Sequence, residues 1–494
     1  MSAEEAGLRV ASRRGRWVLA ATIMGSALAG IDATVVGIAL PALGRDFGVG
    51  LETLQWVVTA YTLSLAGLLL VAGSLGDRYG RRRVFVLGVS WFAVASLLCG
   101  LAPDAPSLIA ARALQGVGAA LLTPGSLAIL QASFAGDDKG KAIGAWSGLG
   151  GVATAVGPFL GGWLVGAASW RLIFVINLPL AAAVTVIANR HVPESRDPCA
   201  VGRVDLLGGA LVSGGLLGLV FGLIEASRLG WGSASVVTSL VGGAAGLVLF
   251  VLHERRTEHP MLPLSVFRSR QFSATNLVTF VVYGALGGSF FLLPVQLQQV
   301  GGYSPLQAGT ALLPVTVVML VLSARSGALA GRIGPRLQMS TGPVLVGVGL
   351  LMLSWSGPEE RYLTDVLPAV LVFGLGLATT VAPLTATALS SVRGGHEGVA
   401  SAVNNDVART AGLVAVAVLP ALAGLTGSSY LHPEEFDAGF GTAMQIAAAL
   451  CCGGGLLAAL TIRNPEHERI RHLQPCTCCA VDGTALATRE RVAT

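Results

Sequence analysis

The chain has 494 residues, of which 53% are hydrophobic and only 12% are charged, and its mean hydropathy is +0.71. Soluble globular proteins carry roughly 25% charged residues, so this composition excludes a soluble enzyme or binding module and predicts a body embedded in a lipid bilayer. The net charge of +5 does not indicate nucleic-acid binding here, because the basic residues fall between long apolar stretches.

The first apolar stretch begins at Trp17, after a basic segment that contains Arg9, Arg13, Arg14 and Arg16. This start resembles a signal peptide, but the stretch is long, lacks a convincing cleavage site and is followed by similar stretches, so we expect a retained helix. A helix needs about 20 residues to cross about 30 Å of hydrocarbon. Fourteen such stretches are predicted, at residues 17–40, 53–74, 84–103, 106–131, 141–167, 171–189, 205–224, 233–252, 272–299, 305–329, 338–356, 364–390, 399–425 and 438–462.

The distribution of positive charge supports this number of helices. If the N-terminus is cytoplasmic, 25 of the 32 Lys and Arg residues fall in cytoplasmic segments. Four fall in external segments and three within predicted helices. A missed or extra helix would disturb the alternation from that point onwards, so the positive-inside rule favours fourteen spans with both termini cytoplasmic. The uncharged stretch 271–324 is divided into two spans by the turn residues at 301–305.

An internal repeat divides the chain. GSLGDRYGRR (Gly73–Arg82) follows the second predicted helix, and GALAGRIGPR (Gly327–Arg336) follows the tenth. A chance match between Gly- and Arg-rich loops is the alternative, but both copies occupy the same place in a six-helix half. We therefore predict an all-α protein with an N-terminal half (1–190), a linker with two inserted helices (191–262), a C-terminal half (263–463) and a tail (464–494). Such halves rock about a site near the bilayer midplane.

Polar residues inside the predicted helices are the candidate site. Asp32 lies in an otherwise apolar helix, where burial brings a carboxyl group into the range of proton exchange at physiological pH. It could instead attract a cationic substrate or be a structural residue near the outer surface. Arg112 and Gln115 share one helical face, and an intramembrane Arg must face a cavity or a partner. The alternative for Arg112 is a structural residue satisfied by backbone carbonyls.

A second charged pair is predicted in the thirteenth helix. Asp406 and Arg409 are three residues apart, so an ion pair between them is the favoured interpretation, and a specialised substrate or proton site is the alternative. Glu225, in the first inserted helix, is expected at the surface. The tail sequence PCTCC lacks a His or a second Cys pair at metal-site spacing, so we expect no metal site. No nucleophile–base set appears, so we do not expect an enzyme.

Two motifs have a readable packing logic. In the loop after helix 2, Gly73 would allow close packing and Gly80 a tight turn. Asp77 would pair with an Arg and a helix N-terminus across the two halves. In helix 5, a row of small residues would form a groove for a neighbouring helix, and a Pro should kink the helix. The helix-5 residues are Ala153, Gly157, Pro158, Gly161 and Gly162.

These motifs resemble those of the major facilitator superfamily. The loop resembles its signature gating loop, at Gly73, Asp77, Arg78, Gly80, Arg81 and Arg82. SLIAARALQGVGAA resembles the helix-4 motif whose Arg, here Arg112, is implicated in proton coupling. GIDATVVGIALP resembles the helix-1 motif of the fourteen-helix drug/proton antiporters, with Gly37 where an Asn is usual, and WRLIFVINLP (Trp170–Pro179) also resembles that branch. Gly157, Pro158, Gly161 and Gly162 resemble the antiporter motif, which implies export.

The resemblance implies proton-driven efflux of small amphipathic drug-like or antibiotic molecules across the cytoplasmic membrane, by a monomer. The chain has no GxxxxGK[ST] loop, so we expect a proton gradient rather than a cofactor or ATP as the energy source. The implied coupling and substrate residues are Asp32, Arg112, Gln115, Asp406 and Arg409. The alternatives are an uptake symporter for a small metabolite and a membrane sensor that does not transport.

Overall fold

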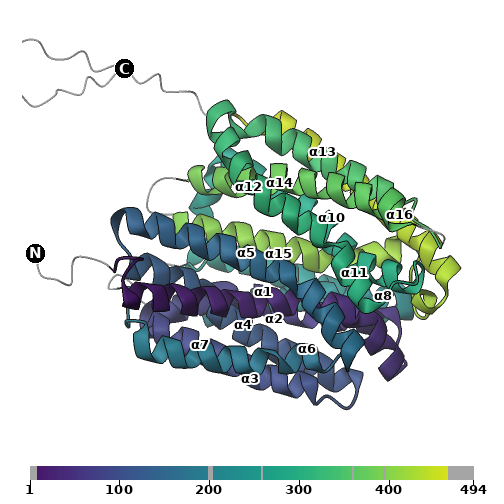
Figure 1. Ribbon diagram of the computed structural model, residues 1–494, viewed down its shortest axis with the longest axis horizontal. Helices are drawn as coiled ribbons and strands as arrows, with labels where there is room; N and C mark the ends of the chain where they lie inside the picture. The colour runs from purple at the N-terminus through teal and green to yellow at the C-terminus, as the bar shows by residue number, and fades with distance from the viewer. Residues whose placement is uncertain (1–7, 198–203, 258–259, 359–360, 393–396, 465–494) are drawn as a thin grey trace, which may run out of the picture.

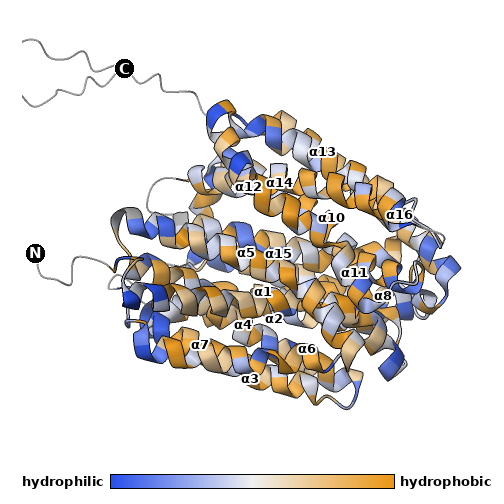
Figure 2. Cartoon of the chain, in the orientation of Figure 1, coloured by the Kyte–Doolittle hydropathy of each residue, from blue (hydrophilic) through white to orange (hydrophobic). Residues whose placement is uncertain are grey.

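The computed structural model describes residues 8–197, 204–257, 260–358, 361–392 and 397–464. Fourteen of the helices formed by these residues, some of them broken, are long and apolar enough to cross a membrane. Apolar residues cover most of their length, and polar residues gather near the helix ends (Figure 2). This confirms the predicted all-α polytopic fold with fourteen membrane helices. Cys199 and the Cys-rich tail lie outside the described residues.

Three groups of helices follow one another along the chain (Figure 1). The first group comprises α1 (Arg13–Phe47), α2 (Leu51–Tyr79), α3 (Arg81–Gly100), α4 (Ala105–Ser133), α5 (Gly136–Ala167), α6 (Leu172–Val175) and α7 (Asn177–His191). The inserted hairpin is α8 (Leu206–Leu229) and α9 (Ala234–Arg256). The last group comprises η1 (Leu264–Arg268), α10 (Arg270–Gln299), α11 (Pro305–Ala311), α12 (Leu313–Ile333), α13 (Pro335–Leu353), η2 (Tyr362–Val366), α14 (Leu367–Ser390), α15 (Glu397–Leu422), η3 (Ser429–Leu431) and α16 (Pro433–Thr461).

The first and last groups repeat one packing pattern. In the first group the packed pairs are α1–α5, α1–α7, α2–α4, α3–α4 and α3–α7. The pairs at the corresponding places of the last group are α10–α15, α10–α16, α12–α14, α13–α14 and α13–α16. The hairpin packs on α2 through α8, which also touches α15. This pattern supports the two predicted halves, whose residue boundaries stay a prediction.

The repeated loop has the same geometry in both groups. Gly80 and Gly334 each end a helix with a positive φ, of +114° and +86°, which favours glycine. Two residues later, the backbone N–H of Arg82 donates to Glu194 Oε1 at 3.1 Å, and that of Arg336 donates to Asn464 Oδ1 at 3.0 Å. Both acceptors lie three residues after the last helix of their group, α7 or α16. The structure therefore extends the sequence repeat to its hydrogen bonds.

The two groups meet at one end of the bundle. We call the face where α1 begins and α16 ends the terminus face, and the other the opposite face. At the opposite face, Leu51 N–H donates to Gly427 O at 2.8 Å, and Gln55 Nε2 donates to Val416 O at 2.6 Å. Gln298 Nε2 donates to the Ile38 carbonyl oxygen there at 3.0 Å. These bonds close the opposite face.

The beginning of α5 lies in open space. A Cβ atom added at Gly140, Gly144 or Gly148 would have no neighbour within 4 Å. These residues occupy the half of α5 nearest the terminus face. In the described part of the chain, the hydrogen bonds that join the two groups lie at the opposite face. The two groups are therefore joined at the opposite face, and the glycines at the beginning of α5 have no close neighbour.

Candidate functional site

Asp32 lies at the centre of a buried polar network inside the first group of helices. It is 1% exposed, in the middle of α1, where apolar neighbours surround it. Its Oδ2 accepts a hydrogen bond from Arg112 Nη1 at 2.5 Å, and its Oδ1 accepts from Gln115 Nε2 at 2.7 Å and from Asn177 Nδ2 at 3.1 Å. The carboxylate is thus held by three donors from α4 and α7. The predicted trio of Asp32, Arg112 and Gln115 forms one site.

Arg112 is the cation that balances Asp32. Its guanidinium is 1% exposed and lies 4.3 Å from the centroid of the Tyr61 ring, an arrangement that stabilises a buried cation. Arg112 Nη1 also donates to Gln115 Oε1 at 2.5 Å, and Arg112 Nε donates to the Val57 carbonyl oxygen at 3.1 Å. One of these acceptors is a backbone carbonyl, and the other two are the side chains of Asp32 and Gln115. The alternative that backbone carbonyls alone satisfy Arg112 is therefore wrong.

Two members of the network were missed from sequence. Ser96 Oγ accepts from Gln115 Nε2 at 2.7 Å and from Asn177 Nδ2 at 3.2 Å, and so ties α3 to α4 and α7. Asn177 lies within WRLIFVINLP, which the sequence analysis noted without a role for the Asn. Both residues are polar groups inside apolar stretches, and this was the sequence feature that could have identified them as members of the network. Buried polar groups of this kind need partners, and here they supply them to one another.

The network holds Asp32 and Arg112 as a buried ion pair in which both carboxylate oxygens of Asp32 accept hydrogen bonds. Asp32 and Arg112 are each 1% exposed, so neither reaches open space in this conformation. This burial shields the carboxyl group from solvent, and the roles of Asp32 in proton exchange and in substrate attraction stay predictions. Removing one charge of a buried ion pair leaves the other uncompensated, so a proton on Asp32 would change what Arg112 contacts.

The expected ion pair between Asp406 and Arg409 is wrong for this conformation. The structure has no ion pair between them among its described residues. Asp406 Oδ1 and Arg409 Nε are buried without hydrogen-bond partners. A spacing of three residues places two side chains on one helical face but does not force them into contact. Their neighbour Asn404 instead donates across to α10, at 2.9 Å to Thr279 Oγ1. Asp406 and Arg409 lie on α15 and do not join the Asp32 network.

Asp77, Arg81 and Arg82 of the gating loop make contacts within the first group of helices. Asp77 Oδ1 lies 2.8 Å from Arg81 Nη2, one turn further along the chain. The backbone carbonyl of Asp77 accepts from Asp197 N–H at 2.9 Å. The predicted pairing of Asp77 across the halves is therefore wrong here, since its ion pair is made within its own half. The close packing expected at Gly73 is not present either, since an added Cβ would meet only Pro124, at the ordinary contact distance of 3.9 Å. The tight turn at Gly80 is confirmed.

The helix-5 glycines bring α5 against two neighbours. A Cβ at Gly157 would overlap Thr34, and one at Gly161 would approach Val35 to 3.1 Å, so these glycines seat α5 on α1. A Cβ at Gly162 would lie 2.8 Å from the Cα of Leu306, at the start of α11. The predicted groove is confirmed on α1, and Gly162 extends it to the last group of helices.

A glycine of α11 likewise allows close approach of α5. A Cβ at Gly309 would overlap the carbonyl oxygen of Pro158. The antiporter motif therefore forms a joint in which α5 touches both α1 and α11. The contact lies towards the opposite face, where α5 ends and α11 begins.

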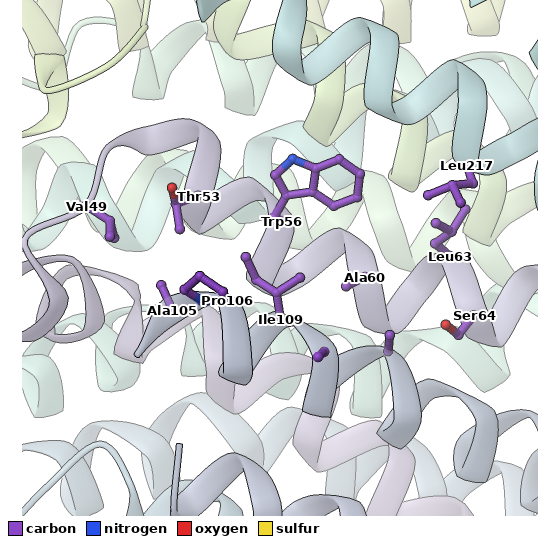
Figure 3. A pocket seen from close by; sticks show the side chains of 12 residues that line it. Val49, Thr53, Trp56, Ala60, Leu63, Ser64, Ala105, Pro106, Ile109 and Leu217 are labelled. Atoms are coloured by element: carbon purple, nitrogen blue, oxygen red, sulfur yellow. The ribbon is translucent and has the colours of Figure 1, made fainter. Parts of the chain in front are cut away.

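Glu225 is not a surface residue as expected. It is 9% exposed and accepts a hydrogen bond from Trp56 Nε1 at 3.1 Å, which docks the inserted hairpin on α2. Beside this contact, a cavity of about 690 Å³ opens between α2, α4 and α8 (Figure 3). Apart from Thr53 and Ser64 its lining is apolar or aromatic, and it contains none of the charged residues of the predicted site.

Two equivalent helix groups, a buried ion pair in one of them and hydrogen bonds between them at the opposite face are typical of a polytopic helical transporter. The sequence model of the Major Facilitator Superfamily matches residues 22–205 and 180–417. The chain belongs to this superfamily.

Curated relatives share more than a third of their aligned residues with this chain. The multidrug resistance protein Stp of Mycobacterium tuberculosis (strain CDC 1551 / Oshkosh) is 37% identical over 84% of this chain and 77% of its own length. The puromycin resistance protein pur8 of Streptomyces alboniger is 37% identical over 87% and 86%, respectively. The tetracenomycin C resistance and export protein of Streptomyces glaucescens is 36% identical over 83% and 76%.

Solved structures share the fold at low sequence identity. A bacterial homologue of the human lysosomal transporter Spinster has a TM-score of 0.65 at 16% identity, over 92% of this chain and all of that chain. A mutant of the peptide transporter POT in complex with sulfate has a TM-score of 0.64 at 14% identity, over 89% and 93%. At these identities the likeness concerns the fold alone.

Proposed function

We propose that this protein exports small amphipathic drug-like or antibiotic molecules across the cytoplasmic membrane in exchange for protons. The names of three relatives support a drug as cargo, since they record multidrug resistance, puromycin resistance, and tetracenomycin C resistance and export. This chain covers at least 76% of each of them. The cargo is therefore proposed as a class of molecules and not as one compound.

The observation that carries the proposed proton coupling is the buried network of Asp32. An ionised Asp32 is held by Arg112, Gln115 and Asn177, whereas a protonated Asp32 would leave Arg112 without its counter-charge. The two protonation states thus favour different arrangements of α1 against α4. One charge that moves across 100 mV supplies about 2.3 kcal/mol, which suffices to drive uphill export.

The orientation follows from the charge distribution. The positive-inside rule would make the terminus face cytoplasmic, with both termini on that side. The conformation described here would then be open to the cytoplasm along α5 and closed outside by the contacts of Gln55 and Gln298. Release of the proton and binding of the drug on the cytoplasmic side would be followed by closure inside, with the joint at Gly157 and Gly162 as the place where α5 pivots; protonation from the outer side would then return the protein to the present conformation. We propose a monomer as the working unit.

The proposal predicts a direction of flux and an energy source. The gene would be expressed in a host that lacks its own efflux pumps, and structurally varied amphipathic compounds would be tested with and without a protonophore. Protonophore-sensitive resistance, with accumulation inside inverted vesicles when their lumen is acidified, would support export. Loss of the compound from acidified inverted vesicles would support the uptake symporter. Resistance without any flux would support a sensor.

A further inference from the structure

Three titratable side chains cluster at the base of the inserted hairpin, away from the Asp32 network. Asp205 caps the start of α8, and its Oδ1 accepts a hydrogen bond from Gly208 N–H at 2.8 Å. His253 Nε2, in the last turn of α9, lies 2.9 Å from the same oxygen. Glu254 follows and is 3% exposed, which is unusual for a carboxyl group at a helix end.

Glu254 fastens the hairpin to the segment that leads to α10. Its Oε2 accepts a hydrogen bond from Leu262 N–H at 3.1 Å. Leu262 packs against an apolar cluster that includes Val266, Phe272 and Val403 and so belongs to the last group of helices. The cluster around Glu254 is therefore the point where the hairpin meets that group.

Two carboxyl oxygens in this cluster are buried without a hydrogen-bond donor. These are Asp205 Oδ2 and Glu254 Oε1. Both converge on Gly208, where an added Cβ would lie 2.5 Å from the Asp205 oxygen and 3.0 Å from the Glu254 oxygen. The side chain of Asp205 is only 7% exposed, so water does not replace the missing donor freely. The absence of a side chain on Gly208 makes room for the two oxygens.

The two free oxygens lie close to each other, since both are within 3.0 Å of one point, the position of a Cβ atom added at Gly208. An ionised carboxylate only accepts hydrogen bonds, so the two free oxygens can be partners only if one of them carries a proton. Two neighbouring buried carboxylates also disfavour double ionisation. We infer that Asp205 and Glu254 together bind one proton and form a second proton-binding site at the base of the inserted hairpin.

Asp205 is the ionised member of this pair. Burial raises the pKa of its carboxyl group, but the Gly208 N–H and the neighbouring His253 outweigh burial and hold the pKa below its usual value. The proton then resides on Glu254. Among the described residues, His253 is the other titratable group that faces the pair, Arg255 and Arg256 are exposed, and α2 presents Val71 to this part of α8.

The shared proton holds three segments together: the start of α8, the end of α9 and the chain at Leu262. Loss of the proton places two adjacent negative charges beside a single His and weakens this junction. The site does not depend on drug export or on Asp32. It adds a point at which the pH on the terminus face acts on the contact between the hairpin and the last group of helices.

The proton can be observed directly on the purified full-length protein. Infrared difference spectra between acidic and alkaline pH would be recorded for the native chain, for Glu254→Gln and for the matched control Glu435→Gln, whose carboxyl group is exposed. We expect a protonated-carboxyl C=O band near neutral pH that Glu254→Gln removes and Glu435→Gln keeps. A band of equal size in Glu254→Gln and in the native chain would overturn the inference.

Thermal unfolding provides a readout that does not require transport. A proton held by the folded state but not by the unfolded chain makes the native protein less stable as pH rises through the titration of the pair. One such proton changes the unfolding equilibrium about tenfold per pH unit. Glu254→Gln, which is neutral at every pH, should lose this dependence, and an unchanged dependence would contradict the site.

Gly208→Ala is a second, independent probe of the pair. The new methyl group would meet both oxygens and separate them, so we expect the C=O band to disappear. Gly214→Ala is its control, because nothing lies within 4 Å of that position. If Glu254→Gln does not fold, the band in Gly208→Ala decides, and its persistence there would refute a shared proton.

Discussion

Replacement of Asp32 by Asn separates the charge of the buried network from its shape. Asn is nearly isosteric, but its amide nitrogen must face either Arg112 Nη1 or the amide nitrogens of Gln115 and Asn177, and all of these are donors. Arg112 would also lose its only ion-pair partner among the described residues. Breaking a buried pair by removing one partner costs about 3–5 kcal/mol.

We therefore predict that Asp32→Asn inserts into the membrane, loses about 3–5 kcal/mol of unfolding free energy and shows no proton-driven efflux. Insertion should survive because the substitution removes a charge from α1. The double variant Asp32→Asn/Arg112→Gln should recover about 2 kcal/mol of the summed losses, since two neutral amides can bond to each other. It should still lack proton-driven efflux because no group remains to take up the proton.

Two measurements check this prediction. Denaturant unfolding of the purified native, single and double variants in detergent gives the coupling free energy between residues 32 and 112. Uptake of a fluorescent amphipathic substrate into inverted vesicles under a proton gradient gives the activity. Full proton-driven uptake by Asp32→Asn would refute the role of its charge. Strictly additive free energies would refute the pairing with Arg112.

Three further predictions concern contacts outside this network. Gly162→Leu should cost about 1–3 kcal/mol by overpacking α5 against α11 and should abolish transport, whereas Gly166→Leu, at a position with open space, should change neither in melting and uptake assays. Glu52→Gln weakens the hydrogen bond that Gly427 N–H donates to Glu52. It should therefore increase severalfold the alkylation of a Cys introduced near the opposite face. An increase of equal size in the control Glu435→Gln would argue against a role of this bond in closing that face. Glu194→Ala removes the acceptor of the hydrogen bond from Arg82 N–H and should lower the melting temperature. An unchanged melting temperature would show that this hydrogen bond adds no stability.

The number of membrane helices could be predicted from sequence because it depends on features that are local in the chain. Apolar length and charge alternation give the fourteen spans, and the turn expected at residues 301–305 separates α10 from α11 in the structure. The lengths of the helices were underestimated. α1, predicted at 17–40, extends from Arg13 to Phe47, because its ends continue beyond the apolar core.

Three of the five network residues could be predicted in the same way. An Asp and an Arg inside apolar helices need partners, and Gln115 lies one turn from Arg112 on the same helix. Ser96 and Asn177 could not be assigned, because their roles depend on how α3 and α7 pack against α1. Helix packing of this kind is a property of the whole bundle and leaves little trace in the spacing of residues.

The predictions that were wrong concern side-chain directions and the state of the transporter. The loop residue Asp77 pairs with Arg81, one turn further along the chain, and not with a residue of the other half. Glu225 is buried because Trp56, on a helix distant in sequence, offers it a donor. A sequence does not specify which of several conformations is present. Contacts that differ between conformations therefore cannot be predicted from the sequence.

The exchange of a proton for a drug through Asp32 is the central claim, and counter-movement of protons tests it most directly. Purified protein would be reconstituted into liposomes that contain a pH-sensitive dye and no imposed gradient, and an amphipathic substrate gradient would then be applied. We expect substrate movement in one direction to drive protons in the other in the native protein and not in Asp32→Asn. Substrate movement without any proton movement in the native protein would contradict the claim.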